Sequence, residues 1–359
     1  MKKIALLLTA ALWLTLCLAV PASAEEGTEE PALEAESFRY RLLEDGTAEI
    51  LKYTGKDFDP ALPDTLDGHP VTSIGDEAFD NARFSMEGLT IPASVTHLGS
   101  NAFSMTDLAE IEIPAGVVSM KDNPFGFCES LENITVAEEN PVFYAEDGVL
   151  FCREDHSLVC YPNLLADPEE DEKISYTVPE GTEIIRSSAF GGVECLSEIL
   201  LPDSLRVIGF QAFGFCWDLD GLVIPDSVTE IGDAAFDTCK YIGRVVLPAG
   251  LKRIPSMLFY ECEDLCEADI PETVTEIGDG AFFCCTGLEQ VRIPDGVTVI
   301  ETSAFEGCSS LSSVVIPDSV QSIGEHAFDF CAEDLVITCG PDSFAKTYCE
   351  QNNIAFRTE

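Results

Sequence analysis

The chain has 359 residues, of which 19 are Lys or Arg and 65 are Asp or Glu, giving a formal net charge of −46. Apolar residues make up 46% of it, which is enough for a sizeable core and excludes a disordered chain. The acidity argues against binding of nucleic acid, whose phosphates need Lys and Arg, and of anionic membrane surfaces. The four His residues are scattered, so a His-based metal or catalytic site has few candidate ligands.

Residues 1–24 have the pattern of a secretory signal peptide. A basic start precedes an apolar run over 4–20, and Ala22 and Ala24 are the small residues of an A-x-A cleavage site. We expect cleavage after Ala24, a secreted mature chain and no insertion of that chain into a membrane. A retained anchor is the alternative, although the run is short for a spanning helix. The Glu-rich residues 25–37 are expected to form an acidic flexible leader.

Most of the remaining chain is one 23-residue repeat. Seven prolines keep this spacing from Pro179 to Pro317, and seven phenylalanines keep it from Phe190 to Phe328. The Phe column continues upstream, with shifts of one residue, at Phe79, Phe103 and Phe125. The unit reads approximately x-V-T-x-I-G-D-x-A-F-x-x-C-x-x-L-x-x-V-x-I-P-D. Such a period predicts a solenoid in which each unit forms one coil.

Each column of the repeat predicts a local structure. Alternating apolar residues over 288–293 indicate a short strand that Pro294 ends, and 274–277 indicate a second one. A glycine column then permits a tight bend. The Asp, Ser and Thr that follow are helix-capping residues, so x-Ala-Phe is predicted to form one helical turn. The fold expected is an α/β repeat solenoid of about ten coils with mostly short parallel strands.

The I-P, I-G-x-x-A-F and C-x-x-L columns resemble the BspA-like leucine-rich repeat family of secreted and cell-surface bacterial proteins. The resemblance implies a right-handed coil stack over 61–338, with a hairpin-bearing insertion at about 138–177. It also implies an N-terminal hairpin cap over 38–60, where Asp45-Gly46 is a turn signal in its own right, and a C-terminal cap over 339–359. Adhesion to, or recognition of, host or microbial macromolecules is the implied function.

The repeat is imperfect at a few positions. Pro255 and Glu301 occupy the glycine column, and Pro124 and Leu258 stand where Ala is usual. We expect these departures to alter local bends without changing the fold.

Half of the fourteen cysteines beyond Cys17 fall in one column: Cys128, Cys216, Cys239, Cys262, Cys285, Cys308 and Cys331. Side chains in register point the same way instead of at each other, so a ladder of buried thiols is predicted. One cysteine per coil does not match the ligand spacing of a zinc site, and no metal is expected. Cross-links between Cys152 and Cys160 and between Cys339 and Cys349 are the candidate disulfides.

No catalytic or nucleotide-binding motif occurs in the chain. The acidic residues that follow the repeat prolines are explained by turn chemistry, with repeated calcium binding as the alternative. We therefore expect a non-enzymatic binding or adhesion protein without a cofactor. A structural spacer of the cell envelope and an enzyme with a site assembled across coils are the alternatives.

A ligand face is predicted where outward positions of successive strands form stripes. The stripe beside the buried Val column contains Leu200, Val223, Val246, Asp269 and Arg292. Arg244 lies in the adjacent stripe, and the aromatic residues Trp217 and Tyr241 lie at the strand entrances. A host or microbial extracellular protein or glycan is the expected partner. The alternative is that exposed Val only favours strand formation.

Overall fold

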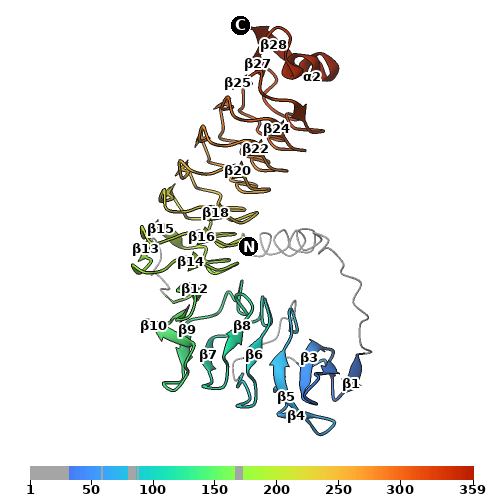
Figure 1. Cartoon of the computed structure of the whole chain (residues 1–359), viewed down its shortest axis with the longest axis vertical. Coiled ribbons are helices and arrows are strands. Elements are labelled where there is room, and N and C mark those ends of the chain that lie inside the picture. Colours follow the sequence, from blue (N-terminus) through green and yellow to red (C-terminus); the bar gives the residue numbers. More distant parts are fainter. Residues whose placement is uncertain (1–31, 58–59, 80–85, 87–88, 166–172) are drawn as a thin grey trace, which may run out of the picture. The chain divides into compact units, whose positions relative to one another are not determined.

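The computed structural model describes residues 32–57, 60–79, 86, 89–165 and 173–359, and residues from Leu33 onward form one compact unit. The signal peptide expected over 1–24 and leader residues 25–31 lie outside the described residues. The repeats stack as a β-solenoid, the coils of which follow one another along the chain (Figure 1).

An antiparallel meander precedes the repeats. It consists of β1 (Leu33–Ala35), β2 (Phe38–Leu42) and β3 (Ala48–Tyr53). The predicted turn forms between β2 and β3, where Asp45 Oδ1 accepts hydrogen bonds from the amide and hydroxyl of Thr47 at 3.0 and 2.7 Å. Residues of β1 were expected in the flexible leader. They pair instead with the edge of β2, because positive φ angles at Glu36 and Ser37 fold the chain back.

Two parallel ladders run through the coils, joining strands that are about one repeat apart in sequence. The V-T-x-I columns supply the first ladder: β5 (His69–Ile74), β6 (His97–Leu98), β8 (Ser119–Met120), β14 (Ile184–Ile185), β16 (Val207–Ile208), β18 (Glu230–Ile231), β20 (Arg253–Ile254), β22 (Glu276–Ile277), β24 (Val299–Ile300) and β26 (Ser322–Ile323). The L-x-x-V-x-I columns supply the second: β7 (Glu110–Ile113), β9 (Asn133–Val136), β13 (Ile174–Thr177), β15 (Leu196–Leu200), β17 (Leu222–Val223), β19 (Arg244–Val246), β21 (Glu267–Asp269), β23 (Gln290–Arg292), β25 (Ser313–Val315) and β27 (Val336–Cys339). A short β4 (Thr65–Leu66) pairs antiparallel with β5.

The stack has about 13 turns instead of the ten expected. The hairpins contribute strands to the ladders, because β3 pairs in parallel with β5, and β12 (Ser157–Cys160) pairs in parallel with β14. At the other end, β28 (Ala355–Thr358) pairs in parallel with β27. The count from the repeat columns was therefore too low, since these strands do not carry the repeat sequence.

The insertion after β9 is a meander of β10 (Phe143–Glu146), β11 (Val149–Cys152) and β12. Both β11 and β12 are buried on both faces, and their alternate side chains belong to the two hydrophobic core clusters on either side. Arg186 anchors this insertion, since its guanidinium donates to Ser157 Oγ at 2.8 Å, Met120 O at 3.0 Å and Asp155 Oδ2 at 2.8 Å. The insertion therefore carries the core across the interruption of the repeat.

The helical turn predicted at x-Ala-Phe is wrong. Amide groups of this segment bond to the next coil instead of within a helix: Ser188 donates to Phe210 O, Phe190 to Ala212 O, and Gly192 to Gly214 O, at 2.8 to 2.9 Å. Every second amide of the segment points to the next coil, and this requires residues with left-handed φ angles four positions apart, such as Ser188 at φ 52° and Gly192 at φ 80°. Inter-coil pairing wins because it satisfies these amides along the whole stack.

The Asp column also acts between coils. Asp76 accepts from the amide of Ser100, and Asp233 accepts from the amide of Ser256, both at 2.9 Å. These carboxylates thus bind the equivalent residue of the following coil, whereas the sequence suggested caps on helices.

Glycine is needed after the first ladder because backbone from the preceding coil passes close by, not because the angle φ is positive. A Cβ at Gly232 would lie 2.5 Å from the amide nitrogen of Phe210. Gly232 and Gly278 also donate to the isoleucine carbonyl of the preceding coil, at 2.8 and 2.9 Å. Pro255 has no amide hydrogen to donate, and the ladder is interrupted at this coil, between β18 and β20.

Phenylalanine fills the interior of the stack. Phe190, Phe213 and Phe236 are fully buried, with ring centroids 4.9 and 5.3 Å apart in stacked pairs. Tyrosines end the column: Tyr53 stacks on Phe79 at 5.8 Å, and Tyr348 meets Phe328 edge-on at 6.2 Å. Tyr348 belongs to α2 (Phe344–Asn352), whose N-cap Ser343 accepts from the Lys346 amide and whose buried side covers the last coil.

The cysteine column forms the predicted buried ladder. Cys239 and Cys262 are fully buried and donate to the carbonyls of Phe213 and Phe236, each at 3.2 Å, and all seven members are free. Burial raises the pKa of the Cys128 thiol to about 11 and shifts the others upward as well. These thiols therefore act as small apolar groups with one weak donor each.

The cysteines of both candidate disulfides are free thiols in the structure. In the hairpin, Cys152 lies opposite Ser157 and Cys160 opposite Leu150, so the two sulfurs do not face each other across the strands. Cys339 and Cys349 are both buried in the C-terminal cap as free thiols.

We expect a maleimide to react rapidly with exposed Cys266 of the native chain and with the ladder thiols only after denaturation. Burial excludes the reagent and keeps the ladder sulfurs protonated. Mass mapping of labelled peptides, with and without denaturant, measures this. A disulfide joining two ladder positions is the result that contradicts it.

Candidate ligand-binding face

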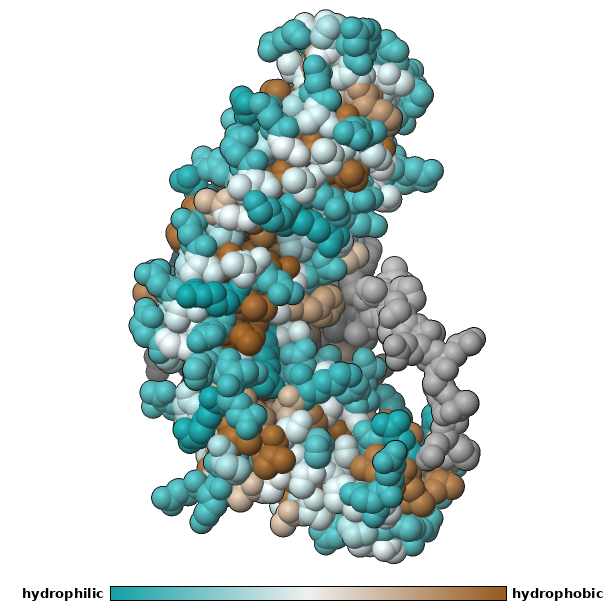
Figure 2. Space-filling model, in the orientation of Figure 1, coloured by the Kyte–Doolittle hydropathy of each residue, from teal (hydrophilic) through white to brown (hydrophobic). Residues whose placement is uncertain are grey.

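The second ladder presents one broad face on which side chains alternate between the core and the exterior. In β19 and β25 the central residue is buried and the flanking two are exposed, as the strand pleat requires. Equivalent outward side chains of neighbouring coils are therefore separated by the distance between adjacent strands. In the orientation of Figure 2 the surface is mostly hydrophilic, with separate hydrophobic areas.

The predicted apolar strip is exposed. Leu200, Val223 and Val246 retain 52%, 66% and 38% of their accessible surface, and Val223 lies in register with Val246. The ladder is interrupted between β15 and β17, where Gly221 adopts a φ of 153°. Hydrogen-bonded pairing therefore joins the two valines, and Leu200 belongs to the neighbouring sheet.

Arg244 borders the strip, but it is already paired. Its guanidinium lies 3.2 Å from Glu267 and 3.5 Å from Asp269, which are acids of the next coil. All three side chains are at least 60% exposed, and exposed ion pairs contribute little free energy. A ligand carboxylate can therefore replace these partners at small cost.

The two aromatic residues lie on consecutive coils, where the amide of Tyr241 donates to Trp217 O at 3.1 Å. Tyr241 is 55% exposed, whereas Trp217 is half-buried beneath Lys240, whose ammonium lies 5.3 Å from the centroid of the Trp217 ring. Tyr241 is thus available to a ligand, whereas Trp217 is largely covered.

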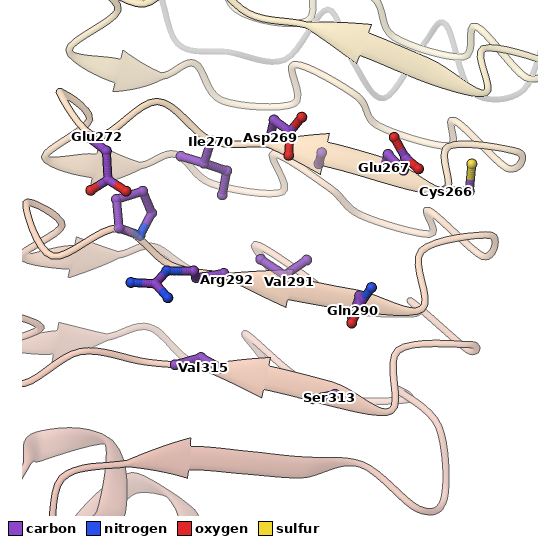
Figure 3. A pocket seen from close by; sticks show the side chains of 12 residues that line it. Cys266, Glu267, Asp269, Ile270, Glu272, Gln290, Val291, Arg292, Ser313 and Val315 are labelled. Carbon is purple, nitrogen blue, oxygen red and sulfur yellow. The ribbon is translucent and has the colours of Figure 1, made fainter. Parts of the chain in front are cut away.

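A hollow of about 520 Å³ opens on the same face between β21 and β23, and the sequence analysis did not identify it (Figure 3). Asp269 and Arg292, predicted as members of the outward stripe, both line it. The remaining lining is Cys266, Glu267, Ala268, Ile270, Glu272, Gln290, Val291, Pro294, Ser313 and Val315. The structure therefore brings Arg244, Asp269 and Arg292 to one part of the face, beside the strip.

The most perturbed carboxyl lies elsewhere, in the turn segment that follows the Phe column. Burial raises the pKa of Asp237 to about 7, and nearby Glu261 adds to the shift. The side chain accepts from Thr238 Oγ1 at 2.8 Å and from Gln211 Nε2 at 3.2 Å. It is 3% exposed, so it has no access to a substrate and acts within the packing.

Within the described ranges, no cluster of three or more His, Cys, Asp or Glu side chains has the arrangement of a metal site. No helix in that same part of the chain has the length and apolarity needed to cross a bilayer.

The fold and the exposed strand face define a solenoid repeat protein of the leucine-rich type. The chain belongs to the BspA type leucine rich repeat family, whose model matches in six copies over residues 66–152, 171–282 and 233–349. No curated protein matches it.

Solved structures of leucine-rich repeat proteins are similar to the chain. A leucine-rich repeat protein from Eubacterium ventriosum is 22% identical, with 83% of this chain and 94% of that chain covered and a TM-score of 0.66. One from Bacteroides ovatus is 24% identical over 91% and 99% of the two chains (TM-score 0.48). A leucine rich cell surface protein from Faecalibacterium prausnitzii is 21% identical over 93% and 100% (TM-score 0.42).

Replacing Asp237 by Asn should stabilise the chain at high pH. The pKa of Asp237 is about 7 in the folded state and 3.8 ordinarily. The stability that this carboxyl contributes to the wild type is therefore complete below about pH 3.8 and is lost as the pH rises through about 7. Urea unfolding at about pH 5 and about pH 8 should show the advantage of Asp237→Asn growing with pH. An equal advantage at both pH values would refute a buried, titrating Asp237.

Proposed function

We propose that the mature chain is a secreted, non-enzymatic protein that binds an extracellular protein or glycan through the exposed face of its second ladder. The observation that carries this proposal is the apolar strip, where Val223 remains 66% exposed on a chain of net charge −46. Water-exposed Leu and Val next to one another are unfavourable unless a partner covers them.

Charged and aromatic groups around the strip support a recognition role. Arg244 supplies a cation with exchangeable partners, and Tyr241 supplies an exposed ring on the same coil. Interfaces commonly gain most of their free energy from a few such aromatic and arginine side chains around an apolar centre. The same face has the broad, continuous form that repeat proteins use for large ligands.

The triple variant Val223→Ser, Val246→Ser and Arg244→Glu should lose partner binding while its thermal unfolding stays nearly unchanged, because these side chains are exposed. Pulldowns of mature protein from extracellular matrix proteins and from bacterial glycans provide the ligand and the measurement. Normal binding by this variant would place the ligand face elsewhere. Val118→Ser, directly before β8, with Arg253→Glu in β20 makes similar changes at the first ladder and should bind as the wild type does.

Export requires the N-terminal segment to act as a cleaved signal. Expression in a secreting bacterial host should release protein into the exterior, and N-terminal sequencing should begin at Glu25. Material that stays in the membrane fraction with Met1 intact would show an anchor instead.

A further inference from the structure

The hollow on the ligand face coincides with an interruption of the second ladder. β21 is the last strand of a sheet that begins at β17, and β23 is the first strand of a sheet that continues to β28. The facing backbone edges of β21 and β23 are therefore not hydrogen-bonded to each other. In Figure 3 the two strands run side by side with the lining side chains around the space between them.

A single small residue accounts for this opening. Ala268 occupies the inward column that holds a larger apolar residue in the neighbouring coils, including Leu222, Val245, Val291 and Val314. Those four are at least 96% buried, whereas Ala268 is half-buried. The missing branched side chain leaves the coil unfilled where β21 should lie against β23.

The chemistry of the hollow fits an extended peptide better than a sugar. Its lining contains no aromatic side chain on which a sugar ring could stack. It offers instead two unpaired strand edges, which is the arrangement used when a peptide adds a strand to a sheet. Val246 pairs with Asp269 at the edge of the hollow, Val223 follows one coil further along the strip, and both can receive apolar side chains of the same segment.

The charges around the hollow select the peptide. Glu267, Asp269 and Glu272 are acidic, and the net charge of −46 attracts basic partners and repels acidic ones. Arg244 neutralises part of the negative charge of Glu267 and Asp269, but Glu272 has no ion pair in the described structure. Arg292 is also without one in that part of the chain, and its guanidinium can donate to peptide carbonyls.

We propose that the opening between β21 and β23 binds an extended, lysine-rich peptide segment of the partner protein, laid along the strand edges. This inference rests on the proposed function, because it assigns the partner of the same face. The peptide lies over the opening, its ammonium groups face Glu272 and the neighbouring acids, and its apolar side chains reach the valine strip.

The probe is an eight-residue peptide of alternating valine and lysine with blocked ends, labelled with a fluorophore, and its counterpart with glutamate in place of lysine. Fluorescence anisotropy with full mature protein should show saturable binding of the lysine peptide that salt weakens. The affinity for the glutamate peptide should be lower by about tenfold or more. Absence of lysine-peptide binding, or equal binding of both peptides, overturns the proposal.

Ala268→Val tests the opening itself, since it restores the residue type of the neighbouring coils. It should weaken lysine-peptide binding by about tenfold or more while thermal stability stays equal or rises. Ala249→Val makes the same change at an exposed turn and should bind normally. Glu272→Gln should weaken binding and its salt dependence, whereas Glu230→Gln on the first ladder should do neither.

The two proposals can fail separately. If the natural partner is lost by the triple variant at Val223, Val246 and Arg244 but retained by Ala268→Val, the proposed function stands and the inference about the opening is wrong. If Ala268→Val loses both the peptide and the partner, with unfolding unchanged, the opening is the partner's binding site.

Discussion

The structure depends on register between neighbouring coils. Each coil must place its Phe ring on the ring of the neighbouring coil and the amides of its Phe segment opposite the carbonyls of the next coil, and both requirements repeat after about 23 residues. Phe282 and Phe305 lie 5.1 Å apart with nearly parallel planes, and the Phe282 amide donates to Ala304 O at 2.8 Å. The repeat length can change by one residue only where the ring and the amides keep these positions: Phe79, Phe103 and Phe125 are 24 and 22 residues apart, and their rings still stack at 5.2 and 5.8 Å.

Coupling between neighbours alone explains why the stack tolerates local defects. Pro255 interrupts the first ladder, and the coil of Ala268 interrupts the second. The ring column nevertheless continues through both, with Phe236 to Phe259 at 5.9 Å and Phe259 to Phe282 at 5.6 Å. The thiol ladder is also unbroken there, since Cys262 and Cys285 bond to the preceding Phe carbonyls at 3.2 and 3.1 Å. A ladder hydrogen bond can thus be lost because two interior columns still hold the coils.

The periodic part of the fold could be predicted from the sequence, because packing constrains side chains that recur. The Phe and Cys columns and the inward Val positions lie where their spacing indicated. The turn segment could not be predicted, since Asp233 followed by two alanines suits a helix start locally, whereas pairing with the next coil is a non-local choice. The strands β3 and β12 were missed as coils because they lack the repeat, and the hollow was missed because one alanine among valines is an ordinary variation.

The sequence correctly predicted which strand side chains point outward. It did not predict how these side chains are grouped on the face. Alternation along a strand fixes exposure, so Val223 and Val246 could be placed from sequence. The pairing of Arg244 with Glu267 and Asp269 depends on side-chain reach between coils, which the repeat columns do not specify. The break between β15 and β17 likewise depends on the backbone angle at Gly221.

Strand propensity alone does not explain the apolar strip. If the outward position required β-branched residues to form a strand, every coil would need one there. The same column holds Asp269 and Arg292, and the latter pairs with its neighbouring coil in an intact sheet. Strand formation therefore tolerates charged side chains at this position, and the solenoid core is satisfied without the strip. Leu200, Val223 and Val246 expose apolar surface that the solenoid core does not need, which agrees with the proposed role of this strip in contact with a partner.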